Sequence, residues 1–443
     1  MALLSRGLLF HILPLNFARR AAGTGLGRLW FRGIAYLAAA LTAVSAPLSH
    51  PSLRIPGGAK MAQWLCLSSV TLLAAAIFVH GAAAAKYLLY IGTYTDHSSK
   101  GIYVCDFDPS TGRLGAPTLA AETSEPSFLA VAPNRRFLYA VNEFDNFKDQ
   151  PTGAVSAFSI DSASRKLALL NQVSSRDSGP AFITLDRSGR YVLVANYTLG
   201  SVAAFPVLPD GSIGESTALV RHHGSSVNPD RQAGPHAHAI LMSPDNRFAI
   251  VADLGLDQLL VYPFDVSRGT LGQARTIKAD PGVGPRHLVF GASGKIVYVI
   301  NEMSSTVTVY SYHSSDGAMV PIQKVPLLPS KFAGESTAAE VVLSPSGKFL
   351  YGSNRGDDSI AVFGIDSKTG TLTLIEHVST GGKTPRSFAI DPSGEWLLAA
   401  NQDSNNVVAF RIDRESGRLT STRQSVEVNS PAMVDFVPLS GGK

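Results

Sequence analysis

The sequence predicts an all-β fold, a seven-bladed β-propeller whose ring is closed by pairing of the N- and C-terminal strands. Three observations lead to this prediction. A unit of about 50 residues recurs along the chain, as in repeat architectures. Each unit contains short apolar strands separated by turn residues. Charged residues make up only 16% of the chain, whereas glycine and proline occur 40 and 26 times, as expected for a protein with many turns.

Six complete units share one order of elements. A connecting segment that ends in or near proline (the entry) is followed by an apolar first strand, a turn, a second strand whose last residue is Asn or Asp, and a third strand. The turns are at 132–135, 186–189, 243–246, 291–294, 344–347 and 391–394. The second strands end at Asn142, Asn196, Asp253, Asn301, Asn354 and Asn401. Because the terminal Asn recurs in nearly every unit, we interpret it as a turn residue that bonds nearby backbone.

The seventh unit is divided between the two ends of the propeller. Segments 87–94 and 101–107 match a second and a third strand, but no first strand precedes them, and the missing strand stands at 430–436. Pairing of these ends closes the ring and leaves no long exposed sheet edge. We therefore expect one propeller domain over residues 86–443.

The N-terminal part of the chain is predicted to be a leader. Residues 61–85 have the pattern of a secretory signal peptide, an apolar run before an alanine-rich cleavage site near Ala85. We therefore expect export to the periplasm or the exterior, with membrane contact only through an uncleaved leader. Residues 1–60 are either a targeting segment or an over-extended gene start, in which case Met61 is the true first residue.

Basic residues are unevenly distributed between leader and propeller. Seven of the 38 Lys and Arg residues lie before residue 86, where no Asp or Glu occurs, so the remainder carries 31 basic against 34 acidic residues. This balance gives no indication of nucleic-acid binding. Cys66 falls in the leader and Cys105 in the propeller, so no internal disulfide is expected after processing.

Two positions of the repeat are predicted to face one mouth of the central channel. The start of the first strand and the end of the second share a rim, because the hairpin turn lies on the other rim. The residues after the entry proline are Ser127, Ala181, His238, Arg286, Ala339, Arg386 and Ala432. The residues just past the terminal Asn or Asp are Glu143, Tyr197, Leu254, Glu302, Arg355 and Gln402.

Residues that differ from the other units at the same repeat position are the best candidates for a functional role, because the fold does not require them. Small residues are the default after the entry proline, so His238 and two arginines stand out. We expect the catalytic residues on neighbouring blades to be His238, Arg286, Glu302 and Arg355. The polar residues expected to bind substrate around them are His236, His287, Glu340, Arg386, Gln402 and Tyr197.

This combination of side chains suits a carbonyl substrate. A neutral histidine with a pKa near its ordinary value of about 6.5 can take a proton from water. Two guanidinium groups can hold a carboxylate or phosphate and stabilise an oxyanion. The hairpin is also expected to place His238 beside Asp253. Two alternatives remain: the pairs His238–Asp253 and Arg286–Glu302 are rim salt bridges, or His236, His238 and Asp253 bind a metal ion.

A set of short motifs stands in a fixed order along the chain: Tyr90-Ile-Gly-Thr-Tyr94, Gly101-Ile-Tyr103, Gly234-Pro-His-Ala-His238, Ala252-Asp-Leu-Gly255, Gly284-Pro-Arg-His287, Asn301-Glu302, Ser353-Asn-Arg-Gly356 and Ala400-Asn-Gln402. In this order they resemble the lactonase family of seven-bladed propellers, which includes bacterial 6-phosphogluconolactonases and fungal carboxy-cis,cis-muconate cyclase. The resemblance implies hydrolysis of sugar lactones without metal or cofactor, or reversible lactone closure. It also implies a site of one His, two Arg and one Glu, which fall on His238, Arg286, Glu302 and Arg355.

The sequence therefore predicts a hydrolase that opens a sugar lactone, with a small-molecule lactone as its partner. The substrate 6-phosphogluconolactone is cytoplasmic, so for an exported protein we expect a non-phosphorylated aldonolactone. Two other functions stay open: a non-catalytic propeller binding module and a lactone-forming cycloisomerase of the muconate cyclase type. A closed polar pocket centred on His238 favours catalysis, whereas a flat open face favours binding.

Overall fold

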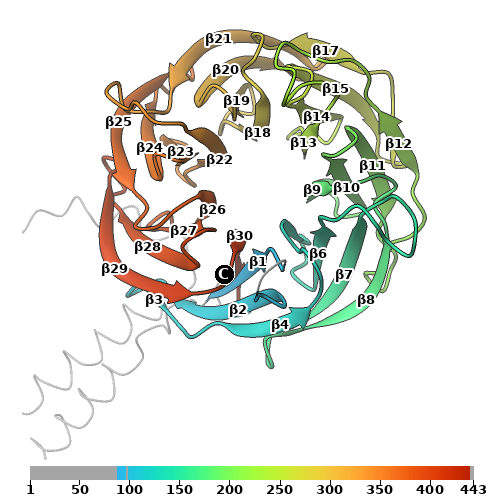
Figure 1. The fold of residues 1–443 in the computed structure, drawn as a ribbon, viewed down its shortest axis with the longest axis horizontal. Helices are drawn as coiled ribbons and strands as arrows, with labels where there is room; N and C mark the ends of the chain where they lie inside the picture. The colour runs from blue at the N-terminus through green and yellow to red at the C-terminus, as the bar shows by residue number, and fades with distance from the viewer. Residues whose placement is uncertain (1–86, 96–97, 440–443) are drawn as a thin grey trace, which may run out of the picture. The chain divides into compact units, whose positions relative to one another are not determined.

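The computed structural model of the protein describes residues 87–95 and 98–439, and the predicted leader segments 1–60 and 61–85 lie outside them. The described chain forms seven antiparallel sheets arranged around a central channel (Figure 1). The predicted all-β, seven-bladed propeller is confirmed. Among the described residues, no helix is long and apolar enough to cross a lipid bilayer.

Each blade runs from a first strand at the channel to an outer strand. The blade that joins both ends comprises β30 (Pro431–Pro438), β1 (Tyr87–Thr93), β2 (Gly101–Asp108), β3 (Arg113–Leu114) and β4 (Thr118–Glu122). The next two comprise β5 (Leu129–Val131), β6 (Phe137–Asn142), β7 (Ala154–Asp161) and β8 (Lys166–Ser174), then β9 (Pro180–Leu185), β10 (Tyr191–Asn196), β11 (Ser201–Pro206) and β12 (Ala218–Arg221).

The other four blades follow in chain order. They comprise β13 (Ala237–Met242), β14 (Phe248–Asp253), β15 (Gln258–Asp265), β16 (Thr270–Leu271) and β17 (Arg275–Lys278), then β18 (Pro285–Phe290), β19 (Ile296–Asn301), β20 (Thr306–His313) and β21 (Ala318–Pro326). The last two comprise β22 (Thr337–Leu343), β23 (Phe349–Arg355), β24 (Ser359–Ile365) and β25 (Leu372–Ser379), then β26 (Pro385–Ile390), β27 (Trp396–Asn401), β28 (Asn406–Ile412) and β29 (Leu419–Glu427).

Antiparallel pairing of β1 with β30 closes the ring, as the sequence predicted. The pairing extends from Tyr87 opposite Pro438 to Thr93 opposite Pro431. Apolar side chains of neighbouring blades then fill the space between sheets, for example Leu89 of β1 with Leu398 of β27. The second strands β6, β10, β14 and β27 are buried along their whole length, as expected for strands covered on both faces.

The turns between first and second strands share one geometry. In the six complete units the fourth turn residue donates its backbone N–H to the carbonyl of the first. That fourth residue has a positive φ in every case, and it is Arg135, Gly189, Asn246, Gly294, Gly347 or Gly394. A type I turn followed by a left-handed residue gives this geometry and favours glycine or asparagine. The Pro/Ser/Asp/Gly/Asn composition of these turns therefore follows from their backbone.

Buried tyrosines tie neighbouring blades together. Tyr139, Tyr298 and Tyr351 lie on second strands and are almost completely buried. Each hydroxyl donates a hydrogen bond of 2.8–2.9 Å to a glycine carbonyl in an outer turn of the next blade. A buried hydroxyl needs such a partner, so these bonds help to fix the spacing between sheets.

The left-handed turn position can be tested at Gly347. Its φ is +70° and an added Cβ would lie 2.6 Å from Cβ of Ala292. Gly347→Ala is therefore expected to lower the free energy of unfolding by at least about 1–2 kcal/mol, the cost of a left-handed non-glycine residue, measured by urea denaturation. Arg135→Gly, at the equivalent position with φ 58°, is the matched control and is expected to be neutral or slightly stabilising. Equal destabilisation by both changes would refute this explanation.

Candidate active site

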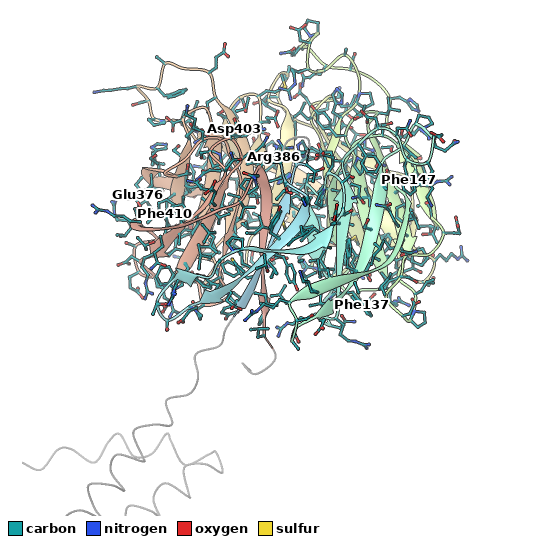
Figure 2. The ribbon with its side chains drawn as sticks, turned by 60° about the horizontal axis from the view of Figure 1, so that its bottom comes forward. Phe137, Phe147, Glu376, Arg386, Asp403 and Phe410 are labelled. Atoms are coloured by element: carbon teal, nitrogen blue, oxygen red, sulfur yellow. The ribbon has the colours of Figure 1, made fainter. Side chains whose placement is uncertain are left out.

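Several first strands carry one unpaired residue near their start. In β13, Ala237 pairs with Asp253 and Ala239 pairs with Ala252, so that His238 has no partner on β14. The same shift leaves Arg286 of β18 and Arg386 of β26 unpaired. Such β-bulges redirect a side chain out of the regular strand alternation. Figure 2 labels Arg386 near one end of the propeller and Phe137, at the start of a second strand, near the other.

The β-bulge in β13 contradicts the predicted pairing of His238 with Asp253. His238 and Asp253 were expected side by side, but the paired residue is Ala237, and the carboxylate of Asp253 has other partners. Its Oδ2 lies 2.6 Å from Nδ1 of His222, and its Oδ1 accepts the backbone N–H of His236 at 2.8 Å. The prediction of a His238–Asp253 pair was wrong because the extra residue in β13 shifts the register by one.

Two of the residues named in the metal alternative, His236 and Asp253, have other partners in this structure. Nδ1 of His236 lies 2.9 Å from the backbone carbonyl of Tyr197, and both carboxylate oxygens of Asp253 are occupied by hydrogen bonds. His236, His238 and Asp253 therefore do not converge on one point. Within residues 87–95 and 98–439, no group of three or more His, Cys, Asp or Glu side chains is arranged to hold an ion.

The carboxylate of Glu302 gathers three guanidinium groups at the mouth. Oε2 lies 3.0 Å from Nε of Arg286 and 2.9 Å from Nη2 of Arg355. Oε1 lies 2.6 Å from Nη2 of Arg231. The expected Arg286–Glu302 pair is thus present, but as part of a larger cluster. One negative charge facing three positive charges leaves an excess of positive charge available to an anion.

Burial and charge act in opposite directions on this cluster. Burial alone would raise the pKa of Glu302, but Arg355, Arg286 and Arg231 outweigh it and lower that pKa to about 2. Burial, assisted by Arg355 and Arg386, lowers the pKa of Arg286 to about 9. At neutral pH Glu302 is therefore ionised and Arg286 is still protonated. Glu302 consequently acts as a fixed counter-ion and is unsuited to be a proton donor.

His238 is buried beside this cluster, and its Nδ1 has no hydrogen-bond partner in the described chain. Its pKa lies well below the ordinary value, first because burial disfavours the imidazolium and then because Arg286, His287, Arg386 and Arg355 repel it. The expectation of a pKa near 6.5 was therefore wrong. The imidazole is therefore neutral at neutral pH.

Aromatic and histidine rings surround His238. Tyr197 presents its edge to His238 with ring centroids 5.4 Å apart, and it stacks on His236 at 4.6 Å. The ring of His287 lies 5.0 Å from that of His238, and its Nδ1 is 2.9 Å from Oε1 of Glu340. The structure thus brings four of the residues expected to bind substrate next to His238 or to each other.

Arg386 lines a small cleft together with Arg286 and His287 but faces a different carboxylate, Glu143. The guanidinium of Arg386 lies 4.9 Å above the ring of Tyr94 and 4.0 Å from Glu143, whose Oε2 accepts the Tyr94 hydroxyl at 2.8 Å. The side-chain oxygen of Gln402 is buried and has no hydrogen-bond partner among the described residues. Glu143 thus balances the charge of Arg386.

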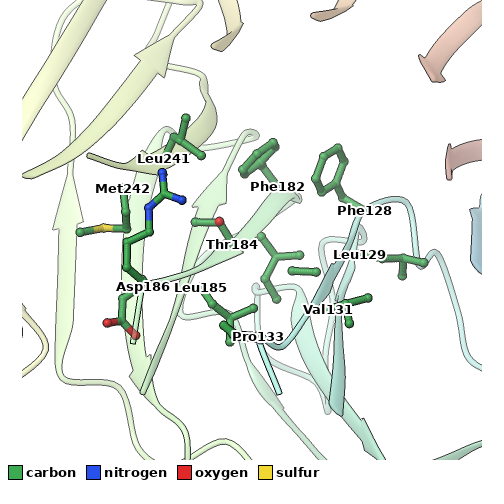
Figure 3. A pocket seen from close by; sticks show the side chains of 13 residues that line it. Phe128, Leu129, Val131, Pro133, Phe182, Thr184, Leu185, Asp186, Leu241 and Met242 are labelled. Atoms are coloured by element: carbon green, nitrogen blue, oxygen red, sulfur yellow. The ribbon is translucent and has the colours of Figure 1, made fainter. Parts of the chain in front are cut away.

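Two cavities lie near these residues. A cleft of about 10 Å³ among the bulge residues is lined by Ser127, Phe128, Glu143, Ala181, Arg286, His287, Arg386, Ser387 and Ala432. This volume suits about one water molecule. A larger cavity of about 490 Å³ lies between β5, β9 and β13 (Figure 3). Apart from Asp186, which bonds its own turn, and Arg187, its lining has no ionisable side chain. The charged mouth is therefore the candidate active site.

An aromatic layer separates the two cavities. The rings of Phe128 and Phe182 are tilted against each other with centroids 4.3 Å apart, and both contact the ring of His287, at 5.6 and 5.1 Å. Phe128 lines both cavities, so it stands between them. These two rings therefore give the His287 side of the charged cluster an apolar neighbour.

The sequence analysis did not single out three of the side chains that contact this site or its supporting residues: Arg231, His222 and Tyr94. Arg231 lies in the connection between β12 and β13. This connection has no counterpart in the repeat, and its unusual length is the one sequence feature that could have drawn attention to Arg231. His222, at the start of the same connection, was missed for the same reason. Tyr94 is the last residue of the motif Tyr90-Ile-Gly-Thr-Tyr94, but its position in the repeat did not predict its contact with Glu143.

Fold and site together define a seven-bladed propeller with an ion-paired cluster of histidine, arginine and glutamate at one mouth of its channel. Residues 88–436 match the family described as "Lactonase, 7-bladed beta-propeller", and the chain belongs to this family.

Named relatives and solved structures agree with this assignment. The chain is 36% identical to the 6-phosphogluconolactonase of Bacillus subtilis (strain 168) over 301 residues, 68% of this chain and 84% of that protein. It is 36% identical to a 6-phosphogluconolactonase of Formosa agariphila over 305 residues, 68% of this chain and 85% of that protein. The solved structure of the periplasmic gluconolactonase of Pseudomonas aeruginosa superposes with a TM-score of 0.76 at 38% identity, covering 80% of this chain and 99% of that one.

The counter-ion role of Glu302 predicts a large effect on stability. Glu302→Gln removes the negative charge while three guanidinium groups stay in place, which is expected to lower the free energy of unfolding by about 3–5 kcal/mol, measured by urea denaturation. The matched control is Asp316→Asn, because Asp316 pairs with Arg275 at 3.2 Å with both side chains about half exposed, where a loss below about 1 kcal/mol is expected. Similar small losses in both variants would contradict this role.

Proposed function

We propose that this protein hydrolyses a sugar lactone to the open-chain acid at the mouth that holds His238 and Glu302. The observation that carries the proposal is a neutral, unpartnered imidazole beside an excess of guanidinium charge. Such a pair supplies a base for water and positive charge for the oxyanion, the two needs of ester hydrolysis. The names of the relatives, 6-phosphogluconolactonase and gluconolactonase, support the same reaction.

In the proposed mechanism His238 takes a proton from the attacking water, and the water oxygen bonds to the lactone carbonyl carbon. Arg355, whose Nε is buried without a partner, and Arg286 stabilise the negative charge on the carbonyl oxygen. The bond from that carbon to the ring oxygen then breaks, and the imidazolium of His238 returns the proton to the ring oxygen. The product is a hydroxy acid that ionises in water.

Glu302 acts through the arginines. Because its pKa is about 2, it stays ionised through the reaction and holds Arg286 and Arg355 in position. Arg286 also donates to the carbonyl of Ala339 at 2.6 Å, so its orientation is fixed from two sides. Preorganised donors of this kind stabilise a transition state without reorganising during the reaction.

We also propose that the reaction needs no metal ion and that the protein acts after export on a non-phosphorylated aldonolactone. The first point rests on Nδ1 of His236 and both carboxylate oxygens of Asp253, which are engaged in other hydrogen bonds. The second rests on the signal-peptide pattern in residues 61–85 and on the likeness to a protein named periplasmic gluconolactonase.

Lactone opening by the purified protein tests this proposal. Glucono-1,5-lactone and its 6-phosphate are offered with EDTA present, and at least one is expected to open faster than in buffer alone. His238→Ala is expected to lower kcat by about 10²–10⁴-fold, the usual contribution of a general base. His313→Ala, an exposed histidine at the end of β20, is the matched control. Unchanged kcat in His238→Ala, or dependence of the rate on added metal, would overturn the corresponding part of the proposal.

The pH dependence of the rate tests the state of His238. Since its pKa is held well below the ordinary value, the neutral base persists as the pH falls through about 6.5. The kcat/KM is therefore expected to stay level there and to decline only at lower pH. Initial rates corrected for spontaneous opening provide the profile. An acid limb centred at or above about 6.5 would show that another group, or an unshifted histidine, is the base.

A further inference from the structure

The connection between β12 and β13 brings one arginine into the site from outside the repeat. This connection, residues 222–236, is called loop 222–236 below. Nη2 of its Arg231 donates to Oε1 of Glu302 at 2.6 Å and to the hydroxyl of Tyr197 at 3.3 Å. In the described part of the chain, neither Nε nor Nη1 of Arg231 makes a hydrogen bond. Arg231 can therefore keep its hold on Glu302 and still offer N–H groups to a further anion.

The backbone of loop 222–236 is held in place by buried contacts. Asp253 binds both of its ends, with Oδ2 at 2.6 Å from Nδ1 of His222 and Oδ1 at 2.8 Å from the backbone N–H of His236. Gln232, next to Arg231, is fully buried and donates to the carbonyl of Leu254 at 2.9 Å. The loop is thus fixed at Arg231 even though it lies outside the propeller strands.

The three arginines on Glu302 differ in depth. The exposed fraction of the side chain rises from 2% for Arg286 to 16% for Arg355 and 40% for Arg231. A lactone whose carbonyl lies near Arg286 and Arg355 would have its distal substituents near Arg231.

We propose that Arg231 is a specificity-determining residue that binds an acidic group carried by the lactone away from its reacting carbonyl. The chemistry it recognises is an oxyanion, either a phosphate or a second carboxylate, since a guanidinium binds both through paired N–H donors. A neutral aldonolactone leaves these donors in water. The inference rests on the proposed function: a second carboxylate would agree with the non-phosphorylated substrate proposed above, whereas a phosphate would replace that part of the proposal.

Kinetics of three lactones test the inference: glucono-1,5-lactone, its 6-phosphate and glucaro-1,4-lactone, which carries a free carboxylate. Arg231→Ala is expected to raise KM for an acid-bearing lactone by about 10–100-fold, the range for a lost hydrogen bond to a charged group. Because Arg231 also binds Glu302, KM for the neutral lactone is expected to rise as well, but by a smaller factor, so the effect is judged by the ratio of the two changes in KM. Arg231→Lys is expected to recover part of the loss, because it restores charge without the paired donors.

Arg275→Ala is the matched control, because Arg275 is a half-exposed arginine paired with Asp316 at 3.2 Å on an outer strand. A selective loss on the phosphate or on the carboxylate lactone supports the proposal and identifies the group bound. Equal losses on all three lactones would overturn it and leave Arg231 as a support for Glu302 alone.

A binding measurement separates this inference from the proposed function. If the wild-type protein opens none of the three lactones, the proposed function fails. Calorimetric titration with 6-phosphogluconate, glucarate and gluconate then still tests Arg231. Tighter binding of an acid-bearing ligand than of gluconate, lost in Arg231→Ala, supports the inference. Binding of all three that is unaffected by the substitution, or the absence of binding, rejects it.

Discussion

The ionic cluster around Glu302 is the interaction on which the proposed site depends. Arg286 comes from β18, Arg355 from the end of β23 and Arg231 from loop 222–236, so one carboxylate joins three separate parts of the chain. Two unit charges 4 Å apart attract by about 4 kcal/mol at an effective dielectric constant of 20, and burial and repulsion among the arginines oppose this attraction. The lowered pKa of Glu302 shows that attraction prevails.

Closure of the ring and the β-bulges in the first strands together place the charged side chains at one mouth of the channel. Closure by β1 and β30 gives every first strand a neighbour on both sides, so that the starts of these strands converge at one mouth. A regular strand would direct alternate side chains into the sheet packing. The bulges at His238 and Arg286 instead release one side chain per strand from that alternation. A structural repeat thereby presents chemically different residues on neighbouring blades.

The sequence was most informative where residues recur in register. The blade count, the ring closure, the turn geometry and the grouping of His238, Arg286, Glu302 and Arg355 follow from aligned units. The pairing of His238 with Asp253 was mispredicted, because a bulge changes register without changing the hydrophobic pattern. Arg231 and His222 were missed because loop 222–236 has no sister segment. The low pKa of His238 depends on burial and on charges from other blades, which no local pattern reveals.

The central claim is that the lactone carbonyl reacts between His238 and the arginines that Glu302 holds. A crystal structure of the protein with a bound aldonate, the ring-opened product, tests it most directly. The account predicts a carboxylate oxygen within hydrogen-bonding distance of Arg355 or Arg286, and the carboxylate carbon beside the His238 ring. An aldonate bound instead in the apolar cavity between β5, β9 and β13, or at Arg386 and Glu143 alone, would contradict it.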